Sequence, residues 1–178
     1  MSREIWIMNS FRIDINTVNE LTPDLAGFVQ RAHDREFGAD SMIYAMPEWY
    51  LLGYFQDEPV TQVGVLQRTI TINQKPLLIA GVSFLITEPG NRGRRFANLI
   101  MKEAMSFARN ILELPFGLLT CKPKLESLYT GMGWRTINEP NTFVQPTGNR
   151  SCGGLIMVNE SGGESWPKGK INLCGLPW

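Results

Sequence analysis

Residues 77–109 read LLIAGVSFLITEPGNRGRRFANLIMKEAMSFAR and combine three structural signals. Residues 77–87 form an almost unbroken apolar run, which predicts a central strand covered on both faces. Residues 88–93 are rich in Pro and Gly, which predicts a turn. Apolar residues then recur at helical spacing from Phe96 to Ile111, which predicts an amphipathic helix. A buried strand therefore runs through a turn directly into a helix.

The turn before this helix has the features of an anion-binding loop. The first N–H groups of a helix have no partner within it, and the helix dipole is positive at that end. Gly93 lets a bulky phosphate approach the backbone. Arg92, Arg94 and Arg95 add guanidinium groups, which pair well with phosphate oxygens. The residues alone leave a second interpretation open, namely a basic turn that faces solvent.

Strand and helix patterns alternate along the rest of the chain. Thr22, Pro23 and Asp24 are typical of a helix start, and Gly38 suits the end of that helix. The patterns predict strands over 4–14, 49–56, 60–72, 116–121, 155–158 and 170–174 and from Trp134, a second short helix or turn over 41–48, and a helix over 123–131. This order predicts a mixed α/β sheet in one domain spanning residues 1–178.

Composition excludes several classes of protein. The 178 residues are 43% hydrophobic and 19% charged with a formal net charge of zero, so neither a disordered chain nor a basic nucleic-acid binder is expected. We see no signal peptide and no apolar run of membrane-spanning length. Three scattered cysteines suit reduced thiols in a cytoplasmic protein. The single histidine, His33, argues against a zinc site or a Ser-His-Asp triad, so we expect no metal.

Charge is unevenly distributed along the chain. Residues 87–124 hold seven basic and three acidic residues, whereas residues 34–58 hold one basic and six acidic residues. One part of the molecule is therefore expected to favour an anion and another part a cation. Uneven surface charge without a purpose is the alternative.

Two motifs resemble the GCN5-related N-acetyltransferase (GNAT) superfamily. The loop Arg92-Gly93-Arg94-Arg95-Phe96-Ala97 resembles its pyrophosphate-binding loop, although Arg95 stands where a glycine is usual. The stretch LYTGMGW at residues 128–134 resembles a second superfamily signature. The resemblance implies a mostly antiparallel, twisted mixed sheet flanked by helices, and acetyl-CoA as co-substrate. It also implies that residues of the loop bind the cofactor, that a backbone N–H near Leu85, Ile86 or Thr87 binds the thioester carbonyl, and that Tyr129 is the general acid. A core aromatic beside Trp134 is the alternative role of Tyr129.

Two narrower resemblances point to acylation of an amino sugar. Residues 65–68, 128–134 and 146–148 and the final Trp178 resemble the aminoglycoside 2′-N-acetyltransferases. Residues 114–117, 123–126 and 165–169 resemble the rhizobial nodulation N-acyltransferase. These families differ in the donor, which is acetyl-CoA in the first and a long-chain acyl carrier in the second.

The acceptor site is expected to include residues from distant parts of the chain. By resemblance to the 2′-N family, Ser83 occupies the place of an acid and Asp40 the place of a substrate-binding aspartate, with Glu36 nearby. The carboxylate and indole of Trp178 are candidates to hold an amine, with residues 140–178 completing the site. A solvated helix end is the alternative for Glu36 and Asp40.

The function these resemblances favour is acetyl-CoA-dependent N-acetylation of an aminoglycoside-type antibiotic, with kasugamycin as one candidate, which would confer resistance. One alternative is transfer of a longer acyl chain to an amino sugar, and another is a domain that binds acyl-CoA without turnover. The expected partner is a small amino-sugar substrate, with neither nucleic acid nor membrane. A homodimer is expected only by analogy with the superfamily.

Overall fold

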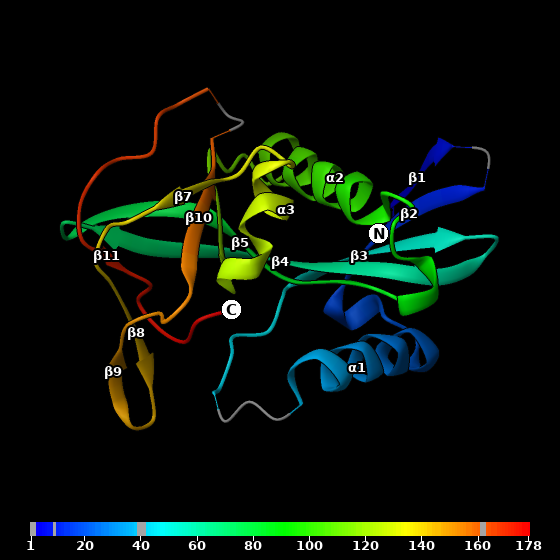
Figure 1. The fold of residues 1–178 in the computed structure, drawn as a ribbon, viewed down its shortest axis with the longest axis horizontal. Coiled ribbons are helices and arrows are strands. Elements are labelled where there is room, and N and C mark those ends of the chain that lie inside the picture. Colours follow the sequence, from blue (N-terminus) through cyan, green and yellow to red (C-terminus); the bar gives the residue numbers. More distant parts are fainter. Residues whose placement is uncertain (1–2, 9, 39–41, 161–162) are drawn as a thin grey trace.

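A single twisted sheet with helices on both faces organises the molecule (Figure 1). The computed structural model describes residues 3–8, 10–38, 42–160 and 163–178. The strands of the main path follow the order β1 (Arg3–Met8), β2 (Phe11–Thr17), β3 (Trp49–Phe55), β4 (Glu58–Ile72), β5 (Lys75–Thr87), β6 (Gly117–Cys121), β10 (Leu155–Asn159) and β7 (Arg135–Ile137). Neighbours along this path are antiparallel except β5 and β6, which are parallel. The expected mixed, mostly antiparallel sheet is confirmed.

Two helices of 15 residues cover opposite faces of the sheet, α2 above it and α1 below it in Figure 1. α2 (Phe96–Asn110) buries its apolar stripe in the larger core, which includes Leu51 of β3. α1 (Pro23–Phe37) packs Phe28 and Val29 against Leu52 of the same strand. Leu51 and Leu52 serve different cores because successive side chains of a strand point to opposite faces.

The ends of α1 agree with the sequence signals. The Thr22 hydroxyl accepts a hydrogen bond from the Leu25 N–H at 3.4 Å, and Pro23 takes the first helical position. Gly38 closes the helix by donating its N–H to the Asp34 carbonyl at 2.9 Å. Cap chemistry is local, so this helix could be placed from the sequence alone.

Smaller elements complete the chain. The short helices are η1 (Val18–Glu20), η2 (Pro89–Asn91), η3 (Pro123–Leu125) and α3 (Glu126–Thr130). The remaining strands are β8 (Asn141–Gln145), β9 (Gly148–Arg150) and β11 (Ile171–Asn172). Within the described ranges, no helix is long and apolar enough to span a membrane.

β5 and β6 pair over a short stretch and then separate, and we call the point where they separate the fork. They pair at only two register positions, Ala80 with Gly117 and Gly81 with Leu118. β5 then continues to Thr87 and β6 to Cys121, with no further pairing between them among the described residues. The backbone of β5 beyond Gly81 is therefore unpaired on its β6 side.

Three sequence predictions need correction. Residues 4–14 are not one strand, because the chain reverses and pairs Met8 with Phe11 in a hairpin. The predicted helix or turn over 41–48 is an irregular connection over residues 42–48, and Ser41 lies outside the described residues. The hairpin β8–β9 was not predicted, because its turn residues at 146–148 dominate a stretch with little apolar alternation.

The end of the chain returns to the fork. The Trp178 side chain is buried, and its indole N–H donates to the Leu118 carbonyl at 3.1 Å. The ring lies so close to Gly81 that a Cβ there would sit 2.6 Å from Trp178 Cε2. In Figure 1 the C-terminus accordingly lies near the middle of the sheet, below α3.

Gly81→Ala is expected to destabilise the protein by about 1–3 kcal/mol, the usual cost of overpacking a filled site. The added methyl would clash with Trp178 and with Leu66 Cδ2 at 2.8 Å. Urea unfolding measures the change. The matched control is Gly90→Ala, since a Cβ at Gly90 meets no atom within 4 Å. Equal unfolding midpoints for the two variants would contradict the packing described.

Candidate active site

A β-bulge in β5 lies beside the fork. Gln62 pairs with Ile86 and Gly64 pairs with Ser83, so Phe84 and Leu85 together face the single residue Val63. Phe84 has a φ of +52°, a backbone conformation that non-glycine residues rarely adopt. A bulge re-aims the local peptide groups, and at this position they lie on the edge where β6 has moved away.

Aromatic rings hold the bulge residue in place. The Phe84 ring meets the rings of His33 and Phe37 of α1 at centroid distances of 4.9 and 5.7 Å. Tyr44, in the connection after α1, approaches the same ring at 6.3 Å. Such edge contacts each contribute about 0.5–1.5 kcal/mol, which offsets the cost of about 1–2 kcal/mol for a left-handed residue.

Leu85, Ile86 and Thr87 are predicted to bind the acyl donor, and their side chains are packed in the cores or hydrogen-bonded, which leaves their backbone groups for this role. The Ile86 side chain is buried toward α1, and Leu85 packs against the core on the other face. The Thr87 hydroxyl lies 2.9 Å from the Thr61 hydroxyl, which donates in turn to the Ile86 carbonyl. The expectation that a backbone N–H in this stretch binds a carbonyl fits this arrangement and stays a prediction.

The loop from β5 to α2 has the backbone of an anion cradle. Gly93 has a φ of +81° with open space around it, and Arg95 has a φ of +65°. Arg95 is the N-cap of α2, and no side chain caps the helix there. The first N–H groups of α2, at Phe96 and Ala97, have no partner within the helix, and the Phe96 ring stacks on Phe11 at 4.5 Å. Left-handed residues beside free N–H groups are a backbone arrangement that can bind phosphate.

Two of the three arginine side chains of this loop already have partners. Arg92 donates to the Thr87 carbonyl at 3.1 Å and to the Glu36 carboxylate at 2.6 Å. Arg94 lies over the Phe55 ring at 5.2 Å. The Glu88 carboxylate pairs with both terminal nitrogens of Arg35 at 3.1 Å. The predicted separation into basic and acidic parts therefore does not hold here, because acids of α1 and bases of the loop pair with each other.

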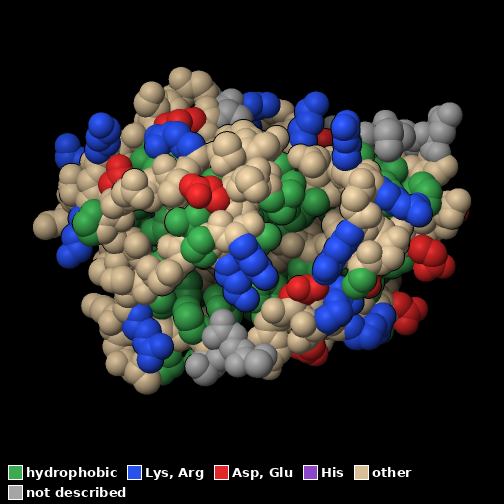
Figure 2. All heavy atoms as spheres, in the orientation of Figure 1, with side chains coloured by type: hydrophobic (Ala, Val, Ile, Leu, Met, Phe, Trp, Pro, Cys, Tyr) green, Lys and Arg blue, Asp and Glu red, His purple; other side chains and the backbone are tan. Residues whose placement is uncertain are grey.

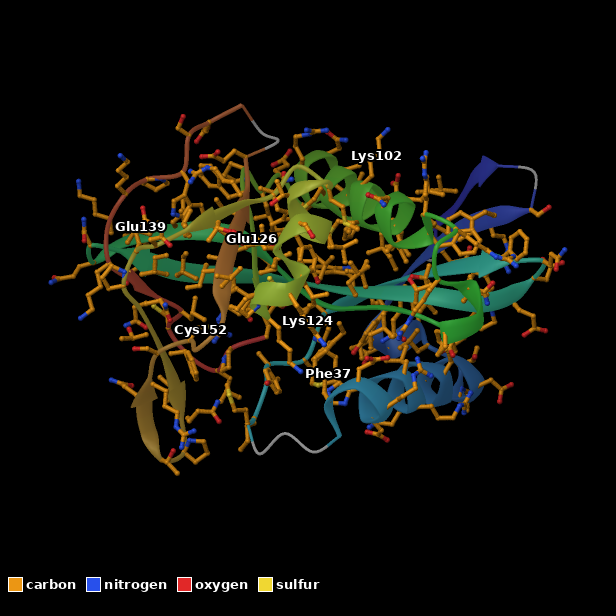
Figure 3. The ribbon with its side chains drawn as sticks, viewed as in Figure 1. Phe37, Lys102, Lys124, Glu126, Glu139 and Cys152 are labelled. Carbon is orange, nitrogen blue, oxygen red and sulfur yellow. The ribbon has the colours of Figure 1, made fainter. Side chains whose placement is uncertain are left out.

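Tyr129 lies in α3, close to the open end of β6. Its ring meets Trp134 edge-on at 6.5 Å, so it also has the core role considered as the alternative. Burial, with a smaller contribution from Cys121, raises the pKa of Tyr129 to about 12. Burial, followed by Glu126 and Cys152, likewise raises the pKa of Cys121 to about 11. Figure 3 shows Glu126 on α3 and Cys152 on the stretch that leads to β10. Both Tyr129 and Cys121 are therefore protonated at neutral pH.

The predicted acceptor residues do not gather around one acidic site. Glu36 is bound to Arg92, and Asp40 lies outside the described residues. The Ser83 hydroxyl oxygen is buried without a partner and would lie 3.2 Å from a Cβ on Gly64. Trp178 reaches the fork through its indole. The acceptor roles of these four residues stay predictions.

Sequence reasoning missed the contacts that tie the acceptor side together. The Gln145 amide accepts from the Ile43 N–H at 3.0 Å and donates to the Ile43 carbonyl at 2.8 Å. The Ala45 N–H donates to the Pro177 carbonyl, and the Val144 N–H donates to the Gly175 carbonyl. The connection after α1, strand β8 and the end of the chain are thus joined beside the fork. No local sequence signal marks a glutamine for this role.

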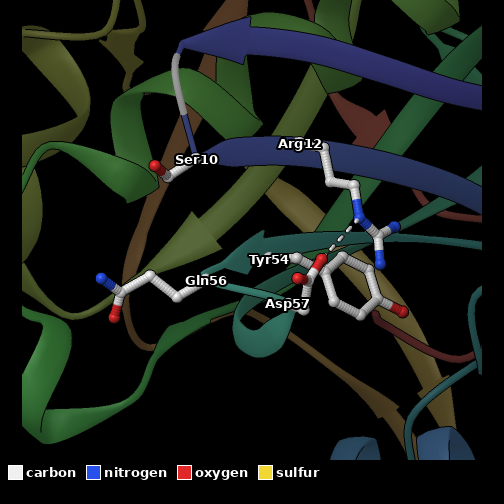
Figure 4. Close-up of a pocket in the computed structure, with 5 residues that line it drawn as sticks. All are labelled: Ser10, Arg12, Tyr54, Gln56 and Asp57. Carbon is white, nitrogen blue, oxygen red and sulfur yellow. Dashed lines mark ion pairs between the residues drawn. The ribbon is translucent and has the colours of Figure 1, made fainter.

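A separate hollow lies at the hairpin end of the sheet (Figure 4). It is lined by Ser10, Arg12, Tyr54, Gln56 and Asp57, none of which is a predicted site residue. The Arg12 guanidinium lies over the Tyr54 ring at 3.9 Å and 3.9 Å from Asp57. Across the described parts of the chain, no group of three or more His, Cys, Asp or Glu could hold a metal ion.

Solved structures share this fold at low sequence identity. Escherichia coli YhbS, a GNAT family N-acetyltransferase crystallised in complex with CoA, matches with a TM-score of 0.63 at 12% identity, over 95% of this chain and 93% of YhbS. Escherichia coli ElaA matches with a TM-score of 0.60 at 13% identity, over 84% of this chain and 99% of ElaA. FeeM, an N-acyl amino acid synthase from uncultured soil microbes, matches with a TM-score of 0.54 at 10% identity, over 85% of this chain and 93% of FeeM. Curated protein sequences give no significant match.

The fold is therefore the one seen in solved structures of GNAT family N-acetyltransferases. The family model of nodulation protein A (NodA) matches residues 25–171, which is most of the chain. The chain belongs to the NodA family. The resemblances to the GNAT superfamily and to the nodulation protein are confirmed, whereas the resemblance to aminoglycoside 2′-N-acetyltransferases stays a prediction.

Replacing Arg95 with glycine is expected to leave the stability unchanged or to raise it by up to about 1 kcal/mol, because glycine relieves the cost of the left-handed conformation. Arg94, whose φ is not positive, is the matched control. Arg94→Gly is expected to lower the stability by about 0.5–1 kcal/mol, since glycine has more freedom to lose. Thermal or urea unfolding compares the two variants. If Arg95→Gly unfolded more easily than Arg94→Gly, the assigned backbone would be wrong.

Proposed function

We propose that this protein transfers an acyl group from a pantetheine thioester to the amine of an amino sugar. The observation that carries the proposal is the fork, where the β5 backbone beyond Gly81 has no β6 partner and is available to pair with an extended thioester arm. The bulge at Phe84 and the uncapped start of α2 lie at successive points along that path. They offer a carbonyl-binding N–H and a phosphate cradle respectively.

Family membership favours a long acyl chain over acetyl. The nodulation N-acyltransferase that the sequence resembles uses a long-chain donor, and this chain belongs to the NodA family. Ile43, Met46 and Val144 are 49%, 58% and 44% exposed, on segments that are joined beside the fork. Figure 2, in the orientation of Figure 1, shows apolar side chains among basic ones in the middle of the face that it displays. An apolar chain would cover such side chains favourably.

The distribution of acids favours an acceptor with a single amine over a polycationic aminoglycoside. Glu36 is paired with Arg92, and Glu48 accepts from the Gln67 N–H at 3.0 Å. Asp57 lies at the distant hairpin beside Arg12. These acids of residues 34–58 therefore do not line one cation site. Residues 140–178 would complete the acceptor side through the Gln145 contacts and Trp178.

The reaction balances without a metal or redox partner. The neutral amine attacks the thioester carbonyl carbon, the carbon–sulfur bond breaks, an amide forms and the amine loses one proton overall to the thiolate. A backbone N–H at the bulge would stabilise the oxyanion. Since the pKa of Tyr129 is about 12 and that of a free thiol about 8.5, full proton transfer from Tyr129 would be uphill by about 5 kcal/mol. Tyr129 therefore acts as a hydrogen-bond donor to the leaving sulfur.

A donor and acceptor matrix tests the proposal. Acetyl-CoA, palmitoyl-CoA and a palmitoylated acyl carrier protein are each combined with a glucosamine oligosaccharide bearing one free amine and with kasugamycin. Mass spectrometry of the acceptor is the readout. We expect palmitoyl transfer to the oligosaccharide. Faster acetyl transfer to kasugamycin would favour the antibiotic-modifying function instead, and binding of CoA without any transfer would favour a non-catalytic module.

Tyr129→Phe is expected to lower kcat by about 10²-fold or more with little change in KM, as for loss of a positioned proton donor. No loss of rate from ionisation of Tyr129 is expected up to about pH 10, because its pKa of about 12 keeps it protonated there. Tyr50→Phe is the matched control, since Tyr50 is also buried with a pKa of about 12 but lies under α1. Equal kcat for both variants would remove Tyr129 from the mechanism.

A further inference from the structure

Four charged side chains link the end of α1 to the loop before α2. Arg92 binds Glu36 at 2.6 Å, and the same Glu36 oxygen lies 3.5 Å from Arg35 Nε. Arg35 in turn holds Glu88 through two contacts of 3.1 Å, which raise the pKa of Arg35. Arg35 and Glu36 are neighbours on α1, and Glu88 and Arg92 belong to one loop, so the contacts form a series of alternating charge from Arg92 through Glu36 and Arg35 to Glu88.

Glu36 and Arg92 are the two residues of this series that are predicted to bind substrates. Arg92 is expected to meet the donor diphosphate, because it begins the cradle that continues through Gly93 and Arg95. Glu36 sits in the last turn of α1, at the start of the connection to Tyr44 and the acceptor side. In the protein without substrates, these two side chains bind each other, so neither is available to its predicted ligand.

Both partners can leave this contact. The Arg92 side chain is 55% exposed and that of Glu36 is 35% exposed, so neither is locked by packing. Arg94, by contrast, lies over the Phe55 ring and contacts no acid of α1 among the described residues. A diphosphate in the cradle carries more charge than one carboxylate and accepts bidentate hydrogen bonds from a guanidinium.

We infer that the Arg92–Glu36 ion pair couples the two substrate sites, so that binding of either substrate favours binding of the other. The donor diphosphate takes Arg92 from Glu36, and the released carboxylate then receives the cationic amine of the acceptor. Without donor, Arg92 competes with that amine for Glu36. The coupling is reciprocal, because a ligand that engages Glu36 also frees Arg92 for the donor. This inference rests on the proposed function and specifies how its two sites are linked.

The donor half is tested with coenzyme A as probe. Titration calorimetry on Glu36→Gln, without acceptor, is expected to show about two- to five-fold tighter binding than for the unchanged protein, the range of one exposed ion pair. Asp34→Asn is the matched control, because it removes the same charge from α1, and among the described residues the Asp34 carboxylate contacts Gln30 and His33 and not Arg92. Its affinity is expected to stay unchanged. Equal or weaker binding by Glu36→Gln, or an equal gain in Asp34→Asn, would overturn the inference.

The acceptor half uses a glucosamine oligosaccharide with one free amine and no donor. Arg92→Gln is expected to bind it about two- to five-fold tighter than the unchanged protein, because Glu36 is then free. Arg94→Gln removes the same charge from the same loop, and because Arg94 lies over Phe55, the binding of the acceptor without donor is expected to stay unchanged. The same gain in both arginine variants, or no gain in Arg92→Gln, would overturn the coupling.

Failure of the coupling and failure of the proposed function give different results. If the unchanged protein binds no coenzyme A at all, the proposed donor site is wrong. If it binds coenzyme A with the affinity of Glu36→Gln, the donor site stands and only the coupling is wrong. Circular dichroism of each variant confirms that the surface substitutions leave the fold intact.

Discussion

The geometry of the candidate site depends on the short length over which β5 and β6 are paired. Two parallel register positions, ending at Gly81 and Leu118, join the two parts of the sheet. Past that point the strands keep their own partners, β4 for β5 and β10 for β6, so the sheet stays continuous although its middle opens. Parallel pairing is slightly less stable per residue than antiparallel pairing, and a short parallel segment is a place where a sheet can open at little cost. The Trp178 indole, bonded to Leu118, closes the pairing on one face.

The site combines this opening with backbone held in uncommon conformations. Phe84 and Arg95 both have positive φ, one at the bulge and one at the start of α2. Neither is a glycine, so each conformation must be maintained by its surroundings. Phe84 is held by the rings of His33, Phe37 and Tyr44, and the adjoining strand end by the two hydroxyls of Thr61 and Thr87. The helix α1 therefore supports the bulge as well as covering the sheet.

Much of the fold could be predicted from local signals. The caps at Thr22 and Gly38, the apolar run of β5 and the stripe of α2 each act within a few residues, and each was placed correctly. The reversal between β1 and β2 was missed because its residues continue the alternation of the flanking strands. The loop motif predicts a phosphate site at the start of α2, but the sequence does not reveal that Arg95 adopts a left-handed conformation there. The pairing of Glu36 with Arg92 joins residues 56 positions apart, so no local pattern contains it.

The positive φ of Phe84 also limits which side chains can replace it. Valine, isoleucine and threonine suit the interior of a strand, yet their branched Cβ is incompatible with a positive φ. Glycine would adopt the backbone freely but would leave the rings of α1 without the surface they pack on. The position therefore tolerates neither the residues typical of strands nor those typical of turns. Planar or unbranched side chains are the ones expected to keep the backbone of the bulge in this conformation, although residue 84 itself carries no reactive group.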